Sequence, residues 1–388
     1  MTTRVGFKLS ASASPFALMT ALGLVGGVIG LAVSTRSFLF SYLAAFGTAF
    51  AVVLGMLFFV LLHHAVDAGW STVARRWAEN FLAAIPWLVL LFLPIYLFKG
   101  TLYDWVDADD HLREVKEPFL NARSFGTRAV LYFVVWLMLA RFLRLRSLAQ
   151  DLSGDPNLSL SMRRWSALGL ILYAITFTFA SIDWFMSVDY HWYSTMFGTY
   201  LFAHGALGAF ALLAMVAVRL RAGPLKQQIP ESTLHDLGKL TFAFSVFWAY
   251  IAFSQWFLIW YGNIPEETIW MITRAQGVWT TARWGMVALL FVIPFVFLMP
   301  ASAKRSPRLL TLVGTGILVG TFTGLHWIVM PAQHPVSFGF GQVLLDLAAL
   351  LLVIGVCGSA VSRAFKAAPL YPLRDPRLAE ATGSEAHA

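Results

Sequence analysis

The sequence contains few charged residues and almost no cysteine. Only 12% of its 388 residues are charged and 59% are hydrophobic, whereas soluble domains carry about 25% charged residues. The single cysteine, Cys357, rules out an internal disulfide, a CxxCH haem attachment motif and a cysteine-ligated iron–sulfur cluster. The sequence has no recognisable catalytic triad or phosphate-binding glycine loop either. We therefore expect no catalytic residue, metal or resident cofactor, and the low charge indicates a protein surrounded by lipid.

Long apolar runs follow one another along the chain. Each is near the 20 residues that a helix needs to cross about 30 Å of hydrocarbon. The runs are continuous rather than alternating, and they are too long for the strands of a membrane barrel. The sequence therefore predicts an all-α, polytopic membrane protein with about ten transmembrane helices. We place these spans at 15–33, 39–64, 81–98, 127–146, 165–185, 195–219, 238–259, 282–299, 308–330 and 340–363.

The formal net charge of +8 could suggest a nucleic-acid partner, but the positions of the cations indicate membrane topology instead. The tails, 1–14 and 364–388, and the even-numbered loops hold 20 of the 28 Lys and Arg residues. Because positive charge favours the cytoplasmic side of a membrane, we expect both termini in the cytoplasm and no nucleic-acid partner. The other eight cations are Arg36, Lys99, Arg113, Lys116, Arg123, Arg128, Arg274 and Arg283.

The opposite, periplasmic side is acidic and aromatic. The third loop, 99–126, contains DWVDADDHLREVKE, and the fifth loop contains DWFMSVDYHWY. The third loop is longer than a connection between neighbouring helices needs to be. We expect it to dock on another protein; the alternative is a solvated acidic loop.

Short motifs recur at similar spacing in the two halves of the sequence. Phe46-Gly47-Thr48 opens the second span, and Phe197-Gly198-Thr199 opens the sixth. Thr127-Arg128 precedes the fourth span, and Thr281-Ala282-Arg283 precedes the eighth. Four spans separate each pair, so both copies run in the same direction, which indicates a parallel repeat. We predict two parallel four-helix bundles, 39–185 and 195–330, with peripheral helices at 15–33 and 340–363.

Ionisable residues within membrane spans are energetically costly and are candidates for function. Histidine titrates near neutral pH, so a histidine in mid-membrane between two polar clusters is typical of a proton path. His204 occupies such a position in the sixth span. The candidate proton path comprises Asp183, His204, Gln255, His326, Asp346, Arg283, His63, His64 and Asp67.

The alternative interpretation of these residues is structural. His204 would then hydrogen-bond a neighbouring helix, and Asp183 or Asp346 would pair with Arg283. A membrane haem is disfavoured, because His204 and His326 lie at different depths and the adjacent His63 and His64 point to different sides of a helix.

Several strings resemble a known family. Ala252-Phe253-Ser254-Gln255, followed by WYGNIPEE at 260–267, is similar to the signature of the ActF membrane subunits of alternative complex III, a bacterial quinol:cytochrome c oxidoreductase. The strings SIDW at 181–184, HWYSTMFG at 191–198, and KEPFLN at 116–121 followed by Arg128 also resemble that family. The signature residues are Gln255, Tyr261, Asn263, Pro265, Glu266 and Glu267.

The resemblance implies a ten-helix, NrfD-like protein of the polysulfide-reductase membrane-subunit type in the bacterial inner membrane. It also implies three partners: a larger homologous membrane subunit, a periplasmic iron–sulfur protein, and c-type cytochrome subunits that carry haem c. The chain would scaffold this respiratory complex, and proton translocation is an additional expectation. A quinone site in this chain is an alternative, with Asp183, His326 or Asp346 as proton acceptor, but the sequence locates no apolar slot for it. The alternative from another class is a secondary transporter, which is disfavoured because transporters often carry inverted repeats.

Overall fold

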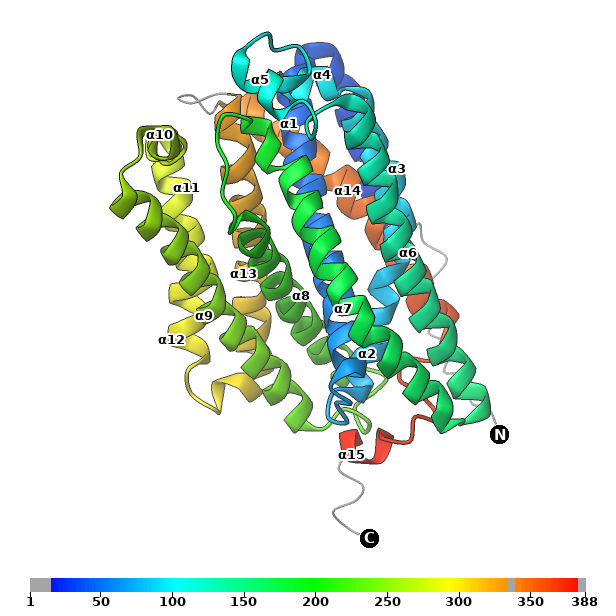
Figure 1. Cartoon of the computed structure of the whole chain (residues 1–388). Coiled ribbons are helices and arrows are strands. Elements are labelled where there is room, and N and C mark those ends of the chain that lie inside the picture. The colour runs from blue at the N-terminus through cyan, green and yellow to red at the C-terminus, as the bar shows by residue number, and fades with distance from the viewer. Residues whose placement is uncertain (1–14, 334–338, 383–388) are drawn as a thin grey trace.

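The computed structural model describes residues 15–333 and 339–382, and every regular element in these ranges is helical (Figure 1). Eight helical segments are long and apolar enough to cross a membrane. The chain is therefore a multi-pass α-helical membrane protein. The eight segments are 15–65, 72–97, 156–189, 197–221, 231–262, 278–298, 307–332 and 340–367.

The first helix, α1 (Pro15–Ala65), contains both of the first two predicted spans. Ser34 has non-helical backbone angles and interrupts it. On one side of this break Gly30 lies against Leu345, and on the other side Ser41 hydrogen-bonds Asp346. The two arms of α1 therefore meet α14 (Phe340–Ala367) at the same level, as in a helical hairpin.

The third and fourth predicted spans correspond to longer helical segments. Residues 72–97 comprise α2 (Thr72–Phe81), the 3-10 helix η1 (Leu82–Ala84) and α3 (Ile85–Leu97). The fourth predicted span lies within α6 (Ala122–Ser153), a long helix that is not among the eight segments. The third loop between them is partly helical and contains α4 (Lys99–Leu102), η2 (Asp104–Val106) and α5 (His111–Lys116).

The middle of the chain forms three more long helices. These are α7 (Pro156–Trp184), α8 (Phe197–Arg221) and α9 (Glu231–Gly262), with η3 (Met186–Asp189) between α7 and α8. Figure 1 places α4, α5 and α10 at one end of the helices and α15 at the other, and we call these the α5 end and the α15 end.

The last part of the chain contains a distorted span and two long helices. The distorted span consists of α11 (Val278–Val287), the π-helix η4 (Ala288–Val292) and α12 (Ile293–Leu298). The remaining elements are α10 (Pro265–Thr273), η5 (Ala303–Arg305), α13 (Pro307–Val329), η6 (Met330–Ala332), α14 and α15 (Leu378–Thr382).

A proline explains the distortion of that span. Pro294 has no N–H and cannot bond the carbonyl of Leu290, four residues earlier. The Ser245 hydroxyl of α9 donates to this carbonyl at 2.7 Å. A neighbouring helix thus satisfies the backbone group that the proline leaves free, as is required inside a membrane.

The core lies where α1 and α8 cross. A methyl group on Gly205 would lie 2.3 Å from the Ala51 carbonyl oxygen, and one on Gly55 would lie 2.5 Å from the Gly205 carbonyl oxygen. Glycine therefore allows the two backbones to approach closely, as small residues do in other membrane proteins. Most of α8 is buried, whereas α9 and α11 each bury a narrower strip.

Candidate functional site

Two of the predicted site residues, His326 of α13 and Asp346 of α14, are in direct contact. His326 Nε2 lies 3.0 Å from Asp346 Oδ2, and both side chains are buried. The Ser41 hydroxyl of α1 donates to Asp346 Oδ1 at 2.6 Å, and Gln342 Nε2 donates to the Ser41 oxygen at 2.6 Å. We call these four residues the His326 cluster. A histidine next to a carboxylate, both hydrogen-bonded and inside a membrane protein, can hold and exchange a proton.

Asp183 lies at the end of α7 and is paired with α6. Arg128 donates to its two carboxylate oxygens at 2.8 and 2.7 Å, and the Tyr132 hydroxyl donates to one of them at 2.8 Å. Asp183 is fully buried. The structural interpretation paired Asp183 or Asp346 with Arg283, and this pairing is wrong. Asp183 is bound by Arg128 instead. Asp346 contacts Ser41, Gln342 and His326.

His204 lies in the first third of α8 and contacts an aromatic residue. Its Nδ1 is 3.0 Å from the Tyr200 carbonyl oxygen, and the Trp248 indole N–H of α9 points at the imidazole from 3.1 Å. A methyl group on Gly324 would lie 2.5 Å from His204 Nε2, so α13 closes the remaining side. Within the described ranges His204 has no carboxylate partner.

Gln255 and Arg283 lie near the α5 end. Gln255 is buried in α9 and borders a small cavity of about 180 Å³ that Ser194, Thr195 and Glu267 also line. The Arg283 guanidinium lies 5.2 Å from the Trp284 ring centre. No hydrogen bond between described residues connects either residue with His204, with Asp183 or with the His326 cluster.

His63 and His64 lie at the α15 end of α1. The His63 Nδ1 is 2.6 Å from the Ser71 hydroxyl, and the two imidazole rings are 4.9 Å apart. Asp67, two residues beyond the end of α1, has a left-handed backbone (φ 55°) and is ion-paired with Arg377 and Arg163 rather than with the histidines.

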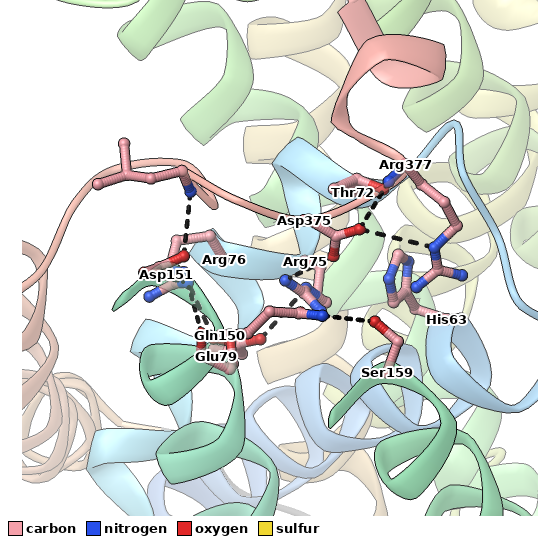
Figure 2. Close-up of polar contacts among 12 residues, drawn as sticks. His63, Thr72, Arg75, Arg76, Glu79, Gln150, Asp151, Ser159, Asp375 and Arg377 are labelled. Carbon is pink, nitrogen blue, oxygen red and sulfur yellow. Dashed lines mark hydrogen bonds and ion pairs between the residues drawn. The ribbon is translucent and has the colours of Figure 1, made fainter. Parts of the chain in front are cut away.

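Beside these histidines lies a network of charged residues that the sequence did not reveal (Figure 2). We call it the arginine network. Arg75 is 3.3 Å from Glu79 and 3.1 Å from Asp375, and Arg76 is 2.7 Å from Asp151. Its members come from α2, α6 and the C-terminal segment: Arg75, Arg76, Glu79, Arg144, Asp151, Asp375 and Arg377.

One sequence signal could have indicated part of this network. Arg75, Arg76 and Glu79 are spaced for ion pairs on one face of a helix. The contacts with Asp151 and Asp375 depend on packing between distant segments and leave no local pattern.

An apolar cavity lies between α1, α7 and α8. It has a volume of about 270 Å³, and four of its nine lining residues are aromatic: Phe58, Tyr173, Phe177 and Phe202. None of the candidate proton-path residues lines it. The cavity is mainly apolar, and it is separate from the polar clusters.

Comparison with known proteins does not identify a family for this chain. No family model matches the chain, and no curated protein matches its sequence. The fold and composition establish a multi-pass helical membrane protein.

Proposed function

We propose that this chain is the ActF-type membrane subunit of an alternative complex III. It would span the bacterial inner membrane ten times, with two spans in α1, one in α6, and both termini in the cytoplasm. Spans two to five and six to nine would form two parallel four-helix bundles. Its role would be to hold the larger homologous membrane subunit and the periplasmic iron–sulfur and cytochrome c subunits, which carry the redox centres.

The position of the signature segment supports this proposal most directly. The segment forms the corner between α9 and α10 at the α5 end, where Asn263 takes a left-handed backbone (φ 47°) and Pro265 begins α10. Trp260 and Tyr261 expose 61% and 76% of their surface. Glu266 is exposed as well. Aromatic and charged side chains at an exposed corner suit contact with another protein.

The third loop, 99–126, supports docking at the same end. The Lys116 ammonium donates to the Tyr190 carbonyl at 2.6 Å, and the Tyr103 hydroxyl donates to the Trp184 carbonyl at 3.1 Å. These contacts hold the third loop against the fifth. A fixed acidic surface is better suited to a partner than a freely moving loop, because less conformational entropy is lost on binding.

Photo-cross-linking from the signature corner tests the scaffold role. A photoreactive amino acid at Tyr261 should capture an iron–sulfur protein, a c-type cytochrome or a second membrane subunit in native membranes. The same amino acid at Leu312, which is 68% exposed on α13, serves as the control and should capture lipid. If the photoreactive amino acid captured lipid and no protein at both positions, the proposal would be contradicted.

We infer in addition that the His326 cluster takes part in proton translocation by the complex. Asp346→Asn retains an acceptor for Ser41 but removes the titratable carboxyl group, so proton translocation should fall while assembly is retained. Arg123→Ala, an exposed change elsewhere, is the control. Normal translocation by the assembled Asp346→Asn complex would exclude this role and leave the scaffold role intact.

The principal alternative is a secondary transporter. A chain that purifies alone and without haem would favour it. A quinol site in this chain is a further alternative, for which the cavity lined by Phe58, Tyr173, Phe177 and Phe202 offers an apolar slot but no acid–base group from the candidate proton path.

A further inference from the structure

The histidine pair at the end of α1 is enclosed in protein although most of its ring nitrogens lack partners. His63 Nδ1 contacts Ser71, but His63 Nε2 and both ring nitrogens of His64 are buried without a hydrogen-bond partner among the described residues. Leaving buried polar atoms unsatisfied is costly. Water is one partner that would satisfy these nitrogens.

The C-terminal segment closes this site from the α15 end. We call residues 368–381 the C-terminal strap. The Trp77 indole N–H donates to the Leu370 carbonyl at 2.8 Å, and the Leu373 N–H donates to Asp151 at 3.0 Å. These contacts fix the strap across α2 and the end of α6. Figure 2 shows Asp375 of the strap beside Arg75 of α2.

Two residues of the strap, Asp375 and Arg377, belong to the arginine network. The Asp375 carboxylate lies 3.1 Å from Arg75 Nη2 and 3.6 Å from Arg377 Nε, and both Asp375 and Arg75 side chains are fully buried. Arg377 reaches Asp67, next to the end of α1. Further along, Glu380 lies against Gly69, where a methyl group would come within 1.8 Å of its carboxylate. The strap thus covers the turn that follows the histidines.

The strap is also the element around the histidines that is best able to move. The histidines lie at the end of α1, next to the start of α2, and both of these helices pack on α8. The strap contains only the short helix α15, and most of its described polar contacts are made with side chains. Local opening of such segments costs less than opening of packed helices.

We propose that residues 368–381 form a movable strap that closes the His63–His64 pair from the aqueous phase, with Asp375 as its latch. In the closed state Asp375 and Glu79 both pair with the buried Arg75. In the open state water replaces Asp375 around Arg75 and reaches the imidazole rings. This proposal does not depend on the identity of the complex or on proton translocation.

Histidine modification in the full-length protein in detergent tests the strap. Diethyl pyrocarbonate acylates accessible neutral imidazoles, and mass spectrometry locates the product. The reference residues are His191, whose side chain is 60% exposed, and His204, which is fully buried. In the unaltered chain the His63–His64 peptide should react far more slowly than His191.

Two variants should open the site. Asp375→Asn removes the latch charge, and a chain ending at Ala367 removes the strap. Both should raise modification of the His63–His64 peptide by about tenfold, because a buried charge loses its partner. Asp236→Asn and a chain ending at Thr382, which keeps the strap, are the matched controls and should not change it.

His204 reports whether the fold persists in each variant. If His204 becomes reactive in the shortened chain, that chain has unfolded. The proposal is then tested by modification of the His63–His64 peptide in the Asp375→Asn variant. The proposal would be overturned if His63 and His64 reacted as fast as His191 in the unaltered chain. It would also be overturned if they stayed protected in Asp375→Asn while His204 stayed protected too.

Discussion

Single side chains inside this bundle are held by specific partners rather than by general burial. Asp183 accepts from Arg128 and Tyr132, whereas Asp346 accepts from Ser41 and contacts His326. The two acids therefore differ in chemistry. An arginine stays protonated and fixes its partner as a carboxylate, whereas a histidine can exchange a proton with one. Asp183 is paired with an arginine, whereas Asp346 is paired with a histidine.

Arg128→Ala should strongly destabilise the protein. The change leaves the Asp183 carboxylate buried with Tyr132 as its remaining side-chain partner, and breaking a buried ion pair in this way costs about 3 kcal/mol or more. Denaturation in detergent, followed by tryptophan fluorescence, would measure the loss. Arg123→Ala, one and a half turns earlier on α6 and exposed, should change stability by less than about 0.5 kcal/mol. Equal stability of the two variants would contradict the assigned role of Arg128.

At this scale the sequence predicted which residues are unusual but not what they contact. Asp183, His326 and Asp346 stand out because ionisable residues are rare in apolar runs. Arg128 and Asp183 are 55 positions apart, and Ser41 and Asp346 are 305 apart. Such pairs depend on how helices pack, and nothing in the local pattern encodes them.

Among the helices, α1 and α8 cross closely at Gly205 and Gly55. Gly205→Ala should destabilise the protein by about 1–3 kcal/mol, because its methyl group would overlap the Ala51 carbonyl and force the helices apart. Gly285→Ala on α11 is the matched control, since a methyl group there would meet nothing within 4 Å and alanine favours helix. Thermal denaturation would compare the melting temperatures of the two variants. If the Gly205→Ala protein were as stable as the Gly285→Ala protein, the close crossing of α1 and α8 would be refuted.

The contact between the third and fifth loops should depend on pH. The Tyr190 hydroxyl and the Arg113 N–H donate to Asp110 and hold the pKa of its carboxyl below the ordinary value of 3.8. A carboxyl group with a lowered pKa stabilises the fold above its unfolded pKa, and this contribution is lost as the pH falls through the lower, folded value.

The Tyr190→Phe variant should reveal this dependence. It should melt at a lower temperature than the unaltered chain at pH 6, and the difference should shrink as the pH falls below 3.8 towards 3. Asp109→Asn, a change at an exposed neighbouring residue, should show no such pattern. A Tyr190→Phe difference that is constant from pH 6 to pH 3 would contradict the assigned hydrogen bond.

Hydrophobic patterning located the long helices well, but it did not locate their ends. The predicted span 127–146 lies inside α6, which runs from Ala122 to Ser153, because polar residues at both ends continue the helix. Asn121 caps it at the start, and Gly154 ends it with a left-handed backbone (φ 70°). The helices within the third loop were not predicted from the sequence.

For the whole molecule, the long apolar helices establish a multi-pass membrane protein, and the buried polar clusters lie at different levels within it. The His326 cluster and Asp183 lie towards the α5 end, and the arginine network lies at the α15 end. His204 lies between them on α8. The sequence predicted a position for His204 between two polar clusters, but it did not reveal the arginine network. The C-terminal strap was not foreseen, because residues 368–381 contain no apolar run.

The central claim is that this chain belongs to a respiratory assembly whose redox centres lie on its partners. The most direct test is mild-detergent purification of the chain at native expression, with haem spectroscopy and mass spectrometry of what accompanies it. Our account predicts a c-type haem spectrum, an iron–sulfur protein and a second, larger membrane subunit. A colourless protein that purifies alone under conditions that preserve other respiratory complexes would contradict the account and favour a transporter.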